Sequence, residues 1–270
     1  MRFLVLTIYI VRLLNWIASF IRTLGDFTLF VFEIFRSSKH FWRRKGLFLK
    51  QCEFIGVGSL GVNIVASMFL GAVLGFQLYV TFHKFGAEGL LGGSIGVSLF
   101  RELGPVMAGI MVTGRAGAAM AAEIASMRIS EQIDALEVMA VDPIEYLVLP
   151  RVLAGLVMLP LLGIFFSILG SISGSLIACG VMGLDPSIYW TQFAKVIDFI
   201  EIVHCVVKSA AFGLVLTSVG CFCGFRAQGG ARAVGFATRS SVVASCLTIL
   251  LSDYVLTSLL PFGFATLKVL

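Results

Sequence analysis

Residues 152–184 read VLAGLVMLPLLGIFFSILGSISGSLIACGVMGL, a long stretch without a single charged side chain. A helix needs about 20 apolar residues to cross the hydrocarbon core of a bilayer, so this stretch is long enough to span one. Pro160 is expected to kink the helix, because proline removes one bond of the helical hydrogen-bond ladder. The stretch therefore predicts a membrane-spanning helix.

The rest of the chain has the same character. Of its 270 residues, 59% are apolar and 13% are charged, whereas a soluble domain carries about 25% charged residues. Four more apolar stretches are long enough to span a bilayer: 54–82, about 90–122, about 202–225 and about 240–264. We therefore predict an all-α integral membrane protein, with a five-helix domain over residues 51–270.

The first fifty residues differ from this domain. Charged residues interrupt the apolar sequence of 1–35, which predicts an amphipathic helix lying in the membrane interface; a poorly formed first span is the alternative. A basic segment without acidic residues follows, consisting of Arg36, Lys39, Arg43, Arg44, Lys45 and Lys50. It directly precedes a span, so anchoring at the anionic cytoplasmic leaflet is favoured over binding of nucleic acid.

The basic residues also predict the orientation. Cytoplasmic loops carry an excess of Lys and Arg, and the two basic regions are the amino-terminal segment and the loop with Arg226, Arg232 and Arg239. Five spans place both regions on the same side of the membrane. We expect a cytoplasmic amino terminus and a carboxyl terminus on the opposite side.

Charged residues inside the predicted spans are the first candidate site. Each costs at least about 2.5–3.5 kcal/mol at the centre of a membrane helix, so such residues usually face protein or water. We expect these charges, from three different spans, to form one buried network or to line a cavity with polar groups: Arg101, Glu102, Lys208 and Asp253. Structural ion pairing that locks the bundle is the alternative, and a proton or ion relay in a secondary carrier is another.

The segment 126–143 is the second candidate site. Ile129, Ile133, Leu136 and Ala140 are spaced as one stripe of a helix, expected over about 127–142 and ended by the residue before Pro143. A short helix with one apolar and one acidic side suits docking into a soluble partner, although an interfacial helix without a partner is also consistent with the spacing.

Pairs of glycines four residues apart occur in four places. Such pairs form grooves that let membrane helices approach closely, and they predict a tightly packed bundle that extends, in one interpretation, across a dimer interface. The pairs are Gly71/Gly75, Gly92/Gly96, Gly170/Gly174 and Gly220/Gly224.

The motifs that the sequence lacks are also informative. It contains no G-x-x-x-x-G-K-[ST] phosphate loop, so energy for transport is expected from a partner or an ion gradient. It contains no H-E-x-x-H or G-x-S-x-G motif, so we expect no enzyme activity, and no metal or cofactor bound by this chain.

The sequence resembles the MlaE/YrbE family of permeases. The resemblance runs from about residue 50 onward, and its motifs are 101–106 (RELGPV), 114–117 (GRAG), 122–124 (AEI), 131–132 (EQ), 139–143 (MAVDP), 150–151 (PR), 207–209 (VKS) and 253–257 (DYVLT). Members of this family are permease subunits of ABC transporters that move phospholipids between the membranes of diderm bacteria.

The resemblance implies partners and roles. It implies a homodimer in the inner membrane with a lipid cavity between the protomers, a cytoplasmic ATPase that binds ATP and Mg²⁺, and an MCE-domain lipid-binding protein on the periplasmic side. Glu102, Lys208 and Asp253 match the family's intramembrane charges, and Arg101 is a candidate contact for the headgroup phosphate. The 126–143 segment matches the coupling helix, with contacts to the ATPase expected from Glu131, Gln132, Asp134, Leu136, Glu137, Met139 and Asp142.

Overall fold

The computed structural model describes residues 2–37 and 45–260, and every regular element in these two ranges is a helix. Five segments are long and apolar enough to cross a membrane: Gly46–His83, Glu88–Ile129, Ile144–Val181, Phe199–Phe225 and Ala231–Leu259. The predicted all-α membrane fold with five spans is therefore confirmed.

Several spans are built from more than one helical element. The first comprises α2 (Lys45–Cys52), η2 (Glu53–Val57) and α3 (Gly58–His83). The second comprises η3 (Glu88–Leu90), α4 (Leu91–Ser98), η4 (Leu99–Leu103), α5 (Gly104–Val112), η5 (Thr113–Gly117) and α6 (Ala118–Ile129). The third comprises η6 (Ile144–Val148), α8 (Leu149–Ser175) and η7 (Leu176–Val181), and the last two are α10 (Phe199–Phe225) and α11 (Ala231–Leu259).

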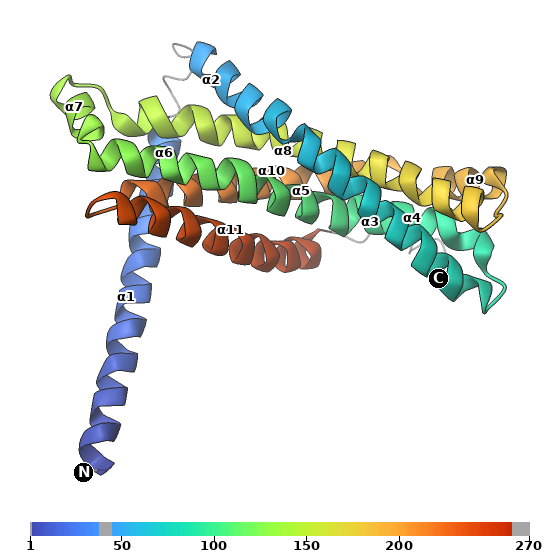
Figure 1. The fold of residues 1–270 in the computed structure, drawn as a ribbon, viewed down its shortest axis with the longest axis horizontal. Coiled ribbons are helices and arrows are strands. Elements are labelled where there is room, and N and C mark those ends of the chain that lie inside the picture. Colours follow the sequence, from blue (N-terminus) through green and yellow to red (C-terminus); the bar gives the residue numbers. More distant parts are fainter. Residues whose placement is uncertain (1, 38–44, 261–270) are drawn as a thin grey trace.

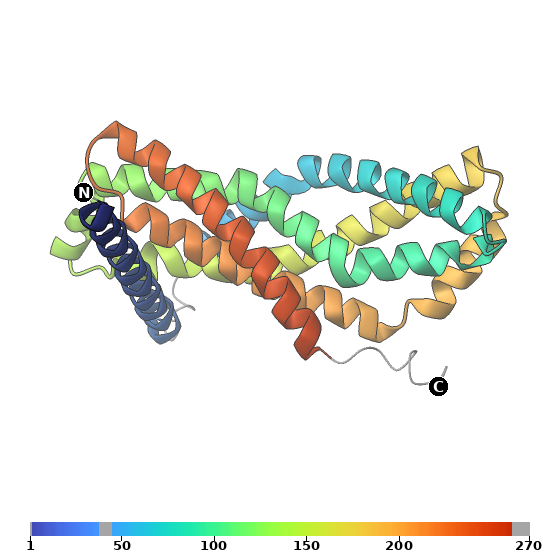
Figure 2. The same ribbon diagram turned by 90° about the horizontal axis from the view of Figure 1, so that it is seen from below.

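The helix α1 (Arg2–Ser37) leaves one end of the bundle crosswise to the spans (Figure 1, Figure 2). The short helix α7 (Gln132–Val138) lies at the same end, and α9 (Pro186–Val196) lies at the opposite end. Phe30 and Ile34 of α1 are buried in a cluster with residues of η6 and α8. Because a helix crosswise to membrane spans runs along the membrane surface, this arrangement favours the interfacial interpretation of α1 over a further span.

The last span differs from its predicted bounds. α11 begins at Ala231, about nine residues before the expected start, and its first turns contain Arg232 and Arg239. Charged residues are tolerated there because the end of a span lies near the headgroups. A prediction based only on the uncharged residues therefore gives a helix that is too short at its amino-terminal end. The last predicted residues of this span, 261–264, lie outside the described residues.

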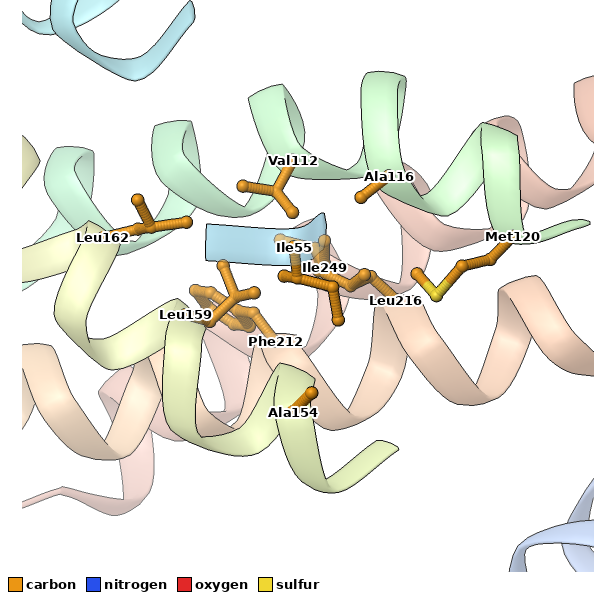
Figure 3. Packing of buried hydrophobic residues seen from close by; sticks show 10 residues of the cluster. All are labelled: Ile55, Val112, Ala116, Met120, Ala154, Leu159, Leu162, Phe212, Leu216 and Ile249. Carbon is orange, nitrogen blue, oxygen red and sulfur yellow. The ribbon is translucent and has the colours of Figure 1, made fainter. Parts of the chain in front are cut away.

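One buried apolar cluster draws residues from all five spans (Figure 3). Phe212 and Leu216 of α10 lie among residues of the second and third spans, and Ile249 is the contribution from α11. The complete cluster consists of Ile55, Val112, Ala116, Met120, Ala154, Leu159, Leu162, Phe212, Leu216 and Ile249. The spans therefore form one packed unit rather than two separate halves.

Two wide, π-helical turns each precede a proline at the same spacing. Pro105 follows η4, and Pro150 follows η6. Proline has no N–H to donate to the carbonyl four residues earlier, which here belongs to Arg101 and to Tyr146, in the middle of each wide turn. The helix therefore widens where the proline removes a bond, whereas α8 continues through Pro160 without such a turn.

The predicted glycine grooves face one another across α3 and α8. A Cβ atom on Gly71 would collide with the carbonyl oxygen of Gly170, and one on Gly75 would lie 2.6 Å from the carbonyl oxygen of Gly174. Ser173 donates a hydrogen bond of 2.6 Å from its Oγ to the carbonyl of Met68 across the same contact. The two backbones are therefore in direct contact, and this contact is possible only with glycine at these positions.

Adding one methyl group to this contact is expected to destabilise the protein. Gly71→Ala should lower the free energy of unfolding by about 1–3 kcal/mol, because a backbone atom, which cannot rotate away, occupies the space. Gly61→Ala on the same helix is the control, since no atom lies within 4 Å of its added Cβ. Unfolding in mixed detergent micelles measures both, and equal stability of the two variants would contradict the close contact.

The helix α9 was not predicted. It begins at Asp185, whose Oδ1 accepts hydrogen bonds from the backbone N–H of Ser187 at 2.8 Å and from its Oγ at 2.5 Å, and these bonds lower the pKa of the carboxyl group. Gly92 and Gly96 of α4 lie directly under α9, where an added Cβ would meet Tyr189 and Phe193. The glycine pair of the second span thus packs against a helix in the loop, not against another span.

The prediction of one continuous helix over about 127–142 is wrong. α6 ends at Ile129, Glu131 adopts a left-handed conformation (φ 58°), and α7 ends at Val138 before a second left-handed residue, Ala140 (φ 57°). The break lets Ile133 turn inward, where it is buried with residues of α1 and α8. Asp142 does not end the helix but starts the next one, by accepting a hydrogen bond from the N–H of Ile144 at 2.9 Å.

Candidate functional site

Lys208 is the centre of a polar network inside the bundle. Its side chain is 1% exposed, and its Nζ lies 2.5 Å from Glu102 Oε2, 2.9 Å from Asp253 Oδ1 and 2.7 Å from Thr257 Oγ1. The ammonium group donates hydrogen bonds to Glu102 and Thr257, and its contact with Asp253 is an ion pair. The predicted meeting of Glu102, Lys208 and Asp253 from three spans is confirmed by this geometry.

The local structure positions each partner of Lys208. Glu102 lies in the wide turn η4, before Pro105. Asp253 and Thr257 are one turn apart on α11, and the Thr257 hydroxyl also lies 2.8 Å from the carbonyl of Asp253 and 3.3 Å from the Glu102 carboxylate. Thr257 therefore links the Lys208 ammonium group to the Glu102 carboxylate, a role that spacing alone did not indicate.

The network is unequally exposed. Lys208 is fully enclosed, whereas the Asp253 side chain is 19% exposed and that of Glu102 is 39% exposed. With all three groups ionised, one cation faces two anions, so the network carries a net charge of −1. Its carboxylates thus open onto the surface of the single chain, where a ligand or a second protein can reach them.

Arg101 belongs to a different pair. Its Nε and Nη2 donate to the two carboxylate oxygens of Glu201, with 2.6 Å for the Nη2 bond, and the Glu201 side chain is 2% exposed. Glu201 lies in the first turn of α10, although the sequence analysis did not identify it as a site residue. A carboxylate in the first turn of a helix is favoured by the helix dipole, which is the signal that points to it. The structure does not join Arg101 to the Lys208 network.

Another intramembrane arginine, Arg115, connects the first two spans. Arg115 in η5 donates to Ser59 Oγ at 3.0 Å and to the carbonyl of Phe54, and its guanidinium stacks over the Phe54 ring at 5.0 Å. These contacts give the guanidinium hydrogen-bond acceptors and an aromatic ring within the protein, so Arg115 is a packing element of the bundle.

The predicted coupling residues lie at the end of the bundle where α1 leaves it. Six of the seven are exposed: Glu131, Gln132, Asp134, Glu137, Met139 and Asp142. Leu136 is half-buried and packs into the cluster that contains Phe30 and Ile34. Asp134 pairs with Arg128 at 2.5 Å, and Asp142 accepts a hydrogen bond from Ser37 Oγ at 3.4 Å.

Val138 is the most exposed apolar residue of this end, at 89%, and Met139 beside it is 64% exposed. The sequence did not predict a role for Val138, because Val138 is not part of the apolar stripe of a helix that continues to residue 142. The acidic residues and these two apolar side chains lie on one surface, which we name the coupling surface after its predicted role and define as the exposed residues of 131–142.

Comparison with known proteins identifies the family. The family model "Permease MlaE" matches residues 48–259, which is most of the chain. The chain belongs to the MlaE permease family. The matched range covers the five spans, apart from the first residues of the first span. Both candidate sites, the Lys208 network and the coupling surface, therefore lie within the part of the chain that matches the family.

Individual relatives agree with this assignment. A "Probable ABC transporter permease protein" of Rickettsia conorii is 40% identical over 89% of this chain and 93% of its own length. The "Intermembrane phospholipid transport system permease protein MlaE" of Haemophilus influenzae is 34% identical over 92% of this chain and 95% of its own length. The Arabidopsis thaliana protein "TRIGALACTOSYLDIACYLGLYCEROL 1, chloroplastic" is 36% identical over 84% of this chain and 64% of its own length. As a member of the MlaE family, this multi-pass membrane protein is a transport component and not an enzyme.

Proposed function

We propose that the chain is the membrane-spanning subunit of an ABC transporter that moves phospholipids between the inner and outer membranes of a diderm envelope. The observation that carries this proposal is the partly open Lys208 network within an apolar bundle of the MlaE family. A phospholipid has a charged headgroup and apolar chains, and a site for it needs both kinds of surface. The Haemophilus relative, named for intermembrane phospholipid transport, supports this substrate class.

Two copies of the chain form the proposed transporter, with the lipid cavity between them. The outward side of α11 supports this arrangement, because Leu247, Leu251 and Tyr254 are 57–78% exposed along one helix that also carries Asp253. Such a surface suits contact with lipid chains or with a second copy. Glu102, Lys208 and Asp253 then face the cavity, and their pairing changes as the transporter opens and closes. Arg101 contacts the headgroup phosphate when it leaves Glu201.

The coupling surface is the proposed contact for a cytoplasmic ATPase, which binds the ATP and Mg²⁺ that this chain does not. α7 and the amino-terminal helix then lie on the cytoplasmic side of the inner membrane, with the carboxyl terminus in the periplasm. An MCE-domain lipid-binding protein is the proposed partner at the α9 end. The basic residues after α10 support this orientation.

Reconstitution tests the proposal against a secondary carrier. The full chain is purified with its ATPase and MCE-domain partners and placed in proteoliposomes that contain a labelled phospholipid. We expect ATP-dependent transfer of the lipid to acceptor vesicles. Uptake driven by a pH gradient without nucleotide would favour a carrier in which Glu102, Lys208 and Asp253 form a proton relay.

A charge on the coupling surface should uncouple the transporter. Val138→Asp is expected to reduce recovery of the ATPase and ATP-dependent lipid transfer at least about tenfold. The reason is that docking of the ATPase would bury a carboxylate where the original protein has an apolar side chain. The stability of the purified chain should change by less than about 0.5 kcal/mol, since the side chain is 89% exposed. Co-purification and transfer assays measure both effects.

Two further variants make this test specific. Phe85→Asp introduces the same charge at a 79% exposed residue of the opposite end and should leave ATPase recovery unchanged. Leu136→Asp should instead destabilise the chain itself, because Leu136 packs against the cluster under α1. Full ATPase recovery with Val138→Asp would refute the coupling role.

A further inference from the structure

A pocket of about 760 Å³ lies where α1, α10 and α11 meet, apart from the Lys208 network. Thr23 of α1, Phe222 at the end of α10, Arg226 in the following loop, and Arg232 and Phe236 of α11 all contribute to its wall. Its volume is in the range of small-molecule sites. Phe222 is fourteen residues beyond Lys208 on α10, about 21 Å along the helix, so the two sites are separate.

The polar part of the pocket is positively charged. Among the described residues that line it, none is acidic, and two are arginines. Arg226 stacks over the Phe222 ring at 5.3 Å and lies 3.4 Å from Asp26, which is outside the pocket wall. Arg232 has no ion pair with any residue in the described part of the chain. One guanidinium is thus oriented by its contacts, and the other is available to an anion.

Much of the remaining wall is apolar, and it continues onto the exposed side of α11. Phe236 is 65% exposed next to the pocket, and alanines at 227, 231, 233 and 237 complete a smooth surface. The pocket lies at the end of the bundle, where α10 ends, α11 begins and α1 runs crosswise (Figure 2). This is the depth at which headgroup phosphates of a bilayer lie beside the first part of their acyl chains.

The neighbouring surface limits what can bind. A second pocket shares Phe222 and Arg226 but is lined by Asp26, Glu33, Glu137 and Asp142. These carboxylates repel an extended polyanion such as nucleic acid. They leave room for one compact phosphate group at the arginines.

We infer that this pocket binds the phosphate of an anionic membrane phospholipid that stays with the protein and is not its cargo. The guanidinium groups of Arg226 and Arg232 hold the phosphate by charge-assisted hydrogen bonds. Phe222 and Phe236 contact the glycerol and the upper acyl chains. The bound lipid joins α1 to the start of α11.

Native mass spectrometry of the full-length protein tests this inference. Delipidated protein is titrated with phosphatidylglycerol in detergent, and with glycerol phosphate and diacylglycerol as separate headgroup and tail probes. We expect Arg226→Gln/Arg232→Gln to weaken binding of one phosphatidylglycerol at least about tenfold, the factor that loss of a charged hydrogen bond produces. Each separate probe should bind at least about tenfold more weakly than the intact lipid.

Matched variants complete the experiment. Arg239→Gln removes the same charge from α11 outside the pocket and should bind lipid like the original protein. Ala233→Trp fills the pocket without changing its charge and should also lose the lipid. Unchanged lipid binding in the double arginine variant would overturn the inference, and so would glycerol phosphate that binds as tightly as phosphatidylglycerol. Equal thermal unfolding midpoints in lipid-free detergent show that the variants are folded.

Discussion

Replacing Lys208 with methionine is expected to abolish lipid transfer and to lower the free energy of unfolding by about 3 kcal/mol. Removal of one partner from a buried ion pair leaves the other charge uncompensated, which costs about 3–5 kcal/mol. Here two carboxylates lose their common cation. The lower end of that range applies because Glu102 remains 39% exposed and is partly solvated. Unfolding in mixed detergent micelles measures the stability, and the proteoliposome assay measures the transfer.

A triple variant separates the two roles considered for the network. In Lys208→Met/Glu102→Gln/Asp253→Asn no ion is left unpaired, so most of the lost stability should return. We expect this stable variant to remain inactive in lipid transfer, because the charges that exchange partners during transport are absent. A triple variant with normal transfer would show that the network only locks the bundle.

Replacing Glu201 with glutamine is expected to have the second largest effect on stability. Arg101, which is 18% exposed, would lose the negative charge and one of the two acceptor oxygens of its partner, and the free energy of unfolding should fall by about 3 kcal/mol. Asp198→Asn is the matched control, because it makes the same chemical change at the exposed residue before α10. Its effect should be within about 0.5 kcal/mol. The same unfolding titration measures both variants.

A double-mutant cycle tests the pair directly. Combining Glu201→Gln with Arg101→Gln should cost at least about 1 kcal/mol less than the sum of the two single effects, because each change removes the same interaction. Additive effects would show that the two side chains do not interact.

The spans were predictable because a bilayer imposes one simple requirement on sequence. Residues 152–184 are an uncharged run long enough to span a bilayer, and the charges at Glu102, Lys208 and Asp253 are expected to face protein or water rather than lipid. The orientation of those side chains then follows from the shared burial. The geometry of this network was therefore accessible from composition and helical spacing.

Other features depend on single backbone conformations or on tertiary contacts. The break between α6 and α7 results from a left-handed Glu131, a residue type that gives little warning of such a conformation. Glu201 lies just before the predicted start of its span at about residue 202, and its pairing with Arg101 depends on α10 beginning at Phe199. The interfacial position of α1 remained open in the sequence, since apolar residues interrupted by arginines suit both an interfacial helix and a weak span.

The contact between Gly71 and Gly170 has a mechanical consequence. Where backbone touches backbone, no side chain can change rotamer to accommodate sliding, so α3 and α8 are held as a single rigid frame. Movement during a transport cycle is then confined to joints filled by side chains. α11, which has few buried residues and carries two of the groups around Lys208, is the element best able to swing against that frame.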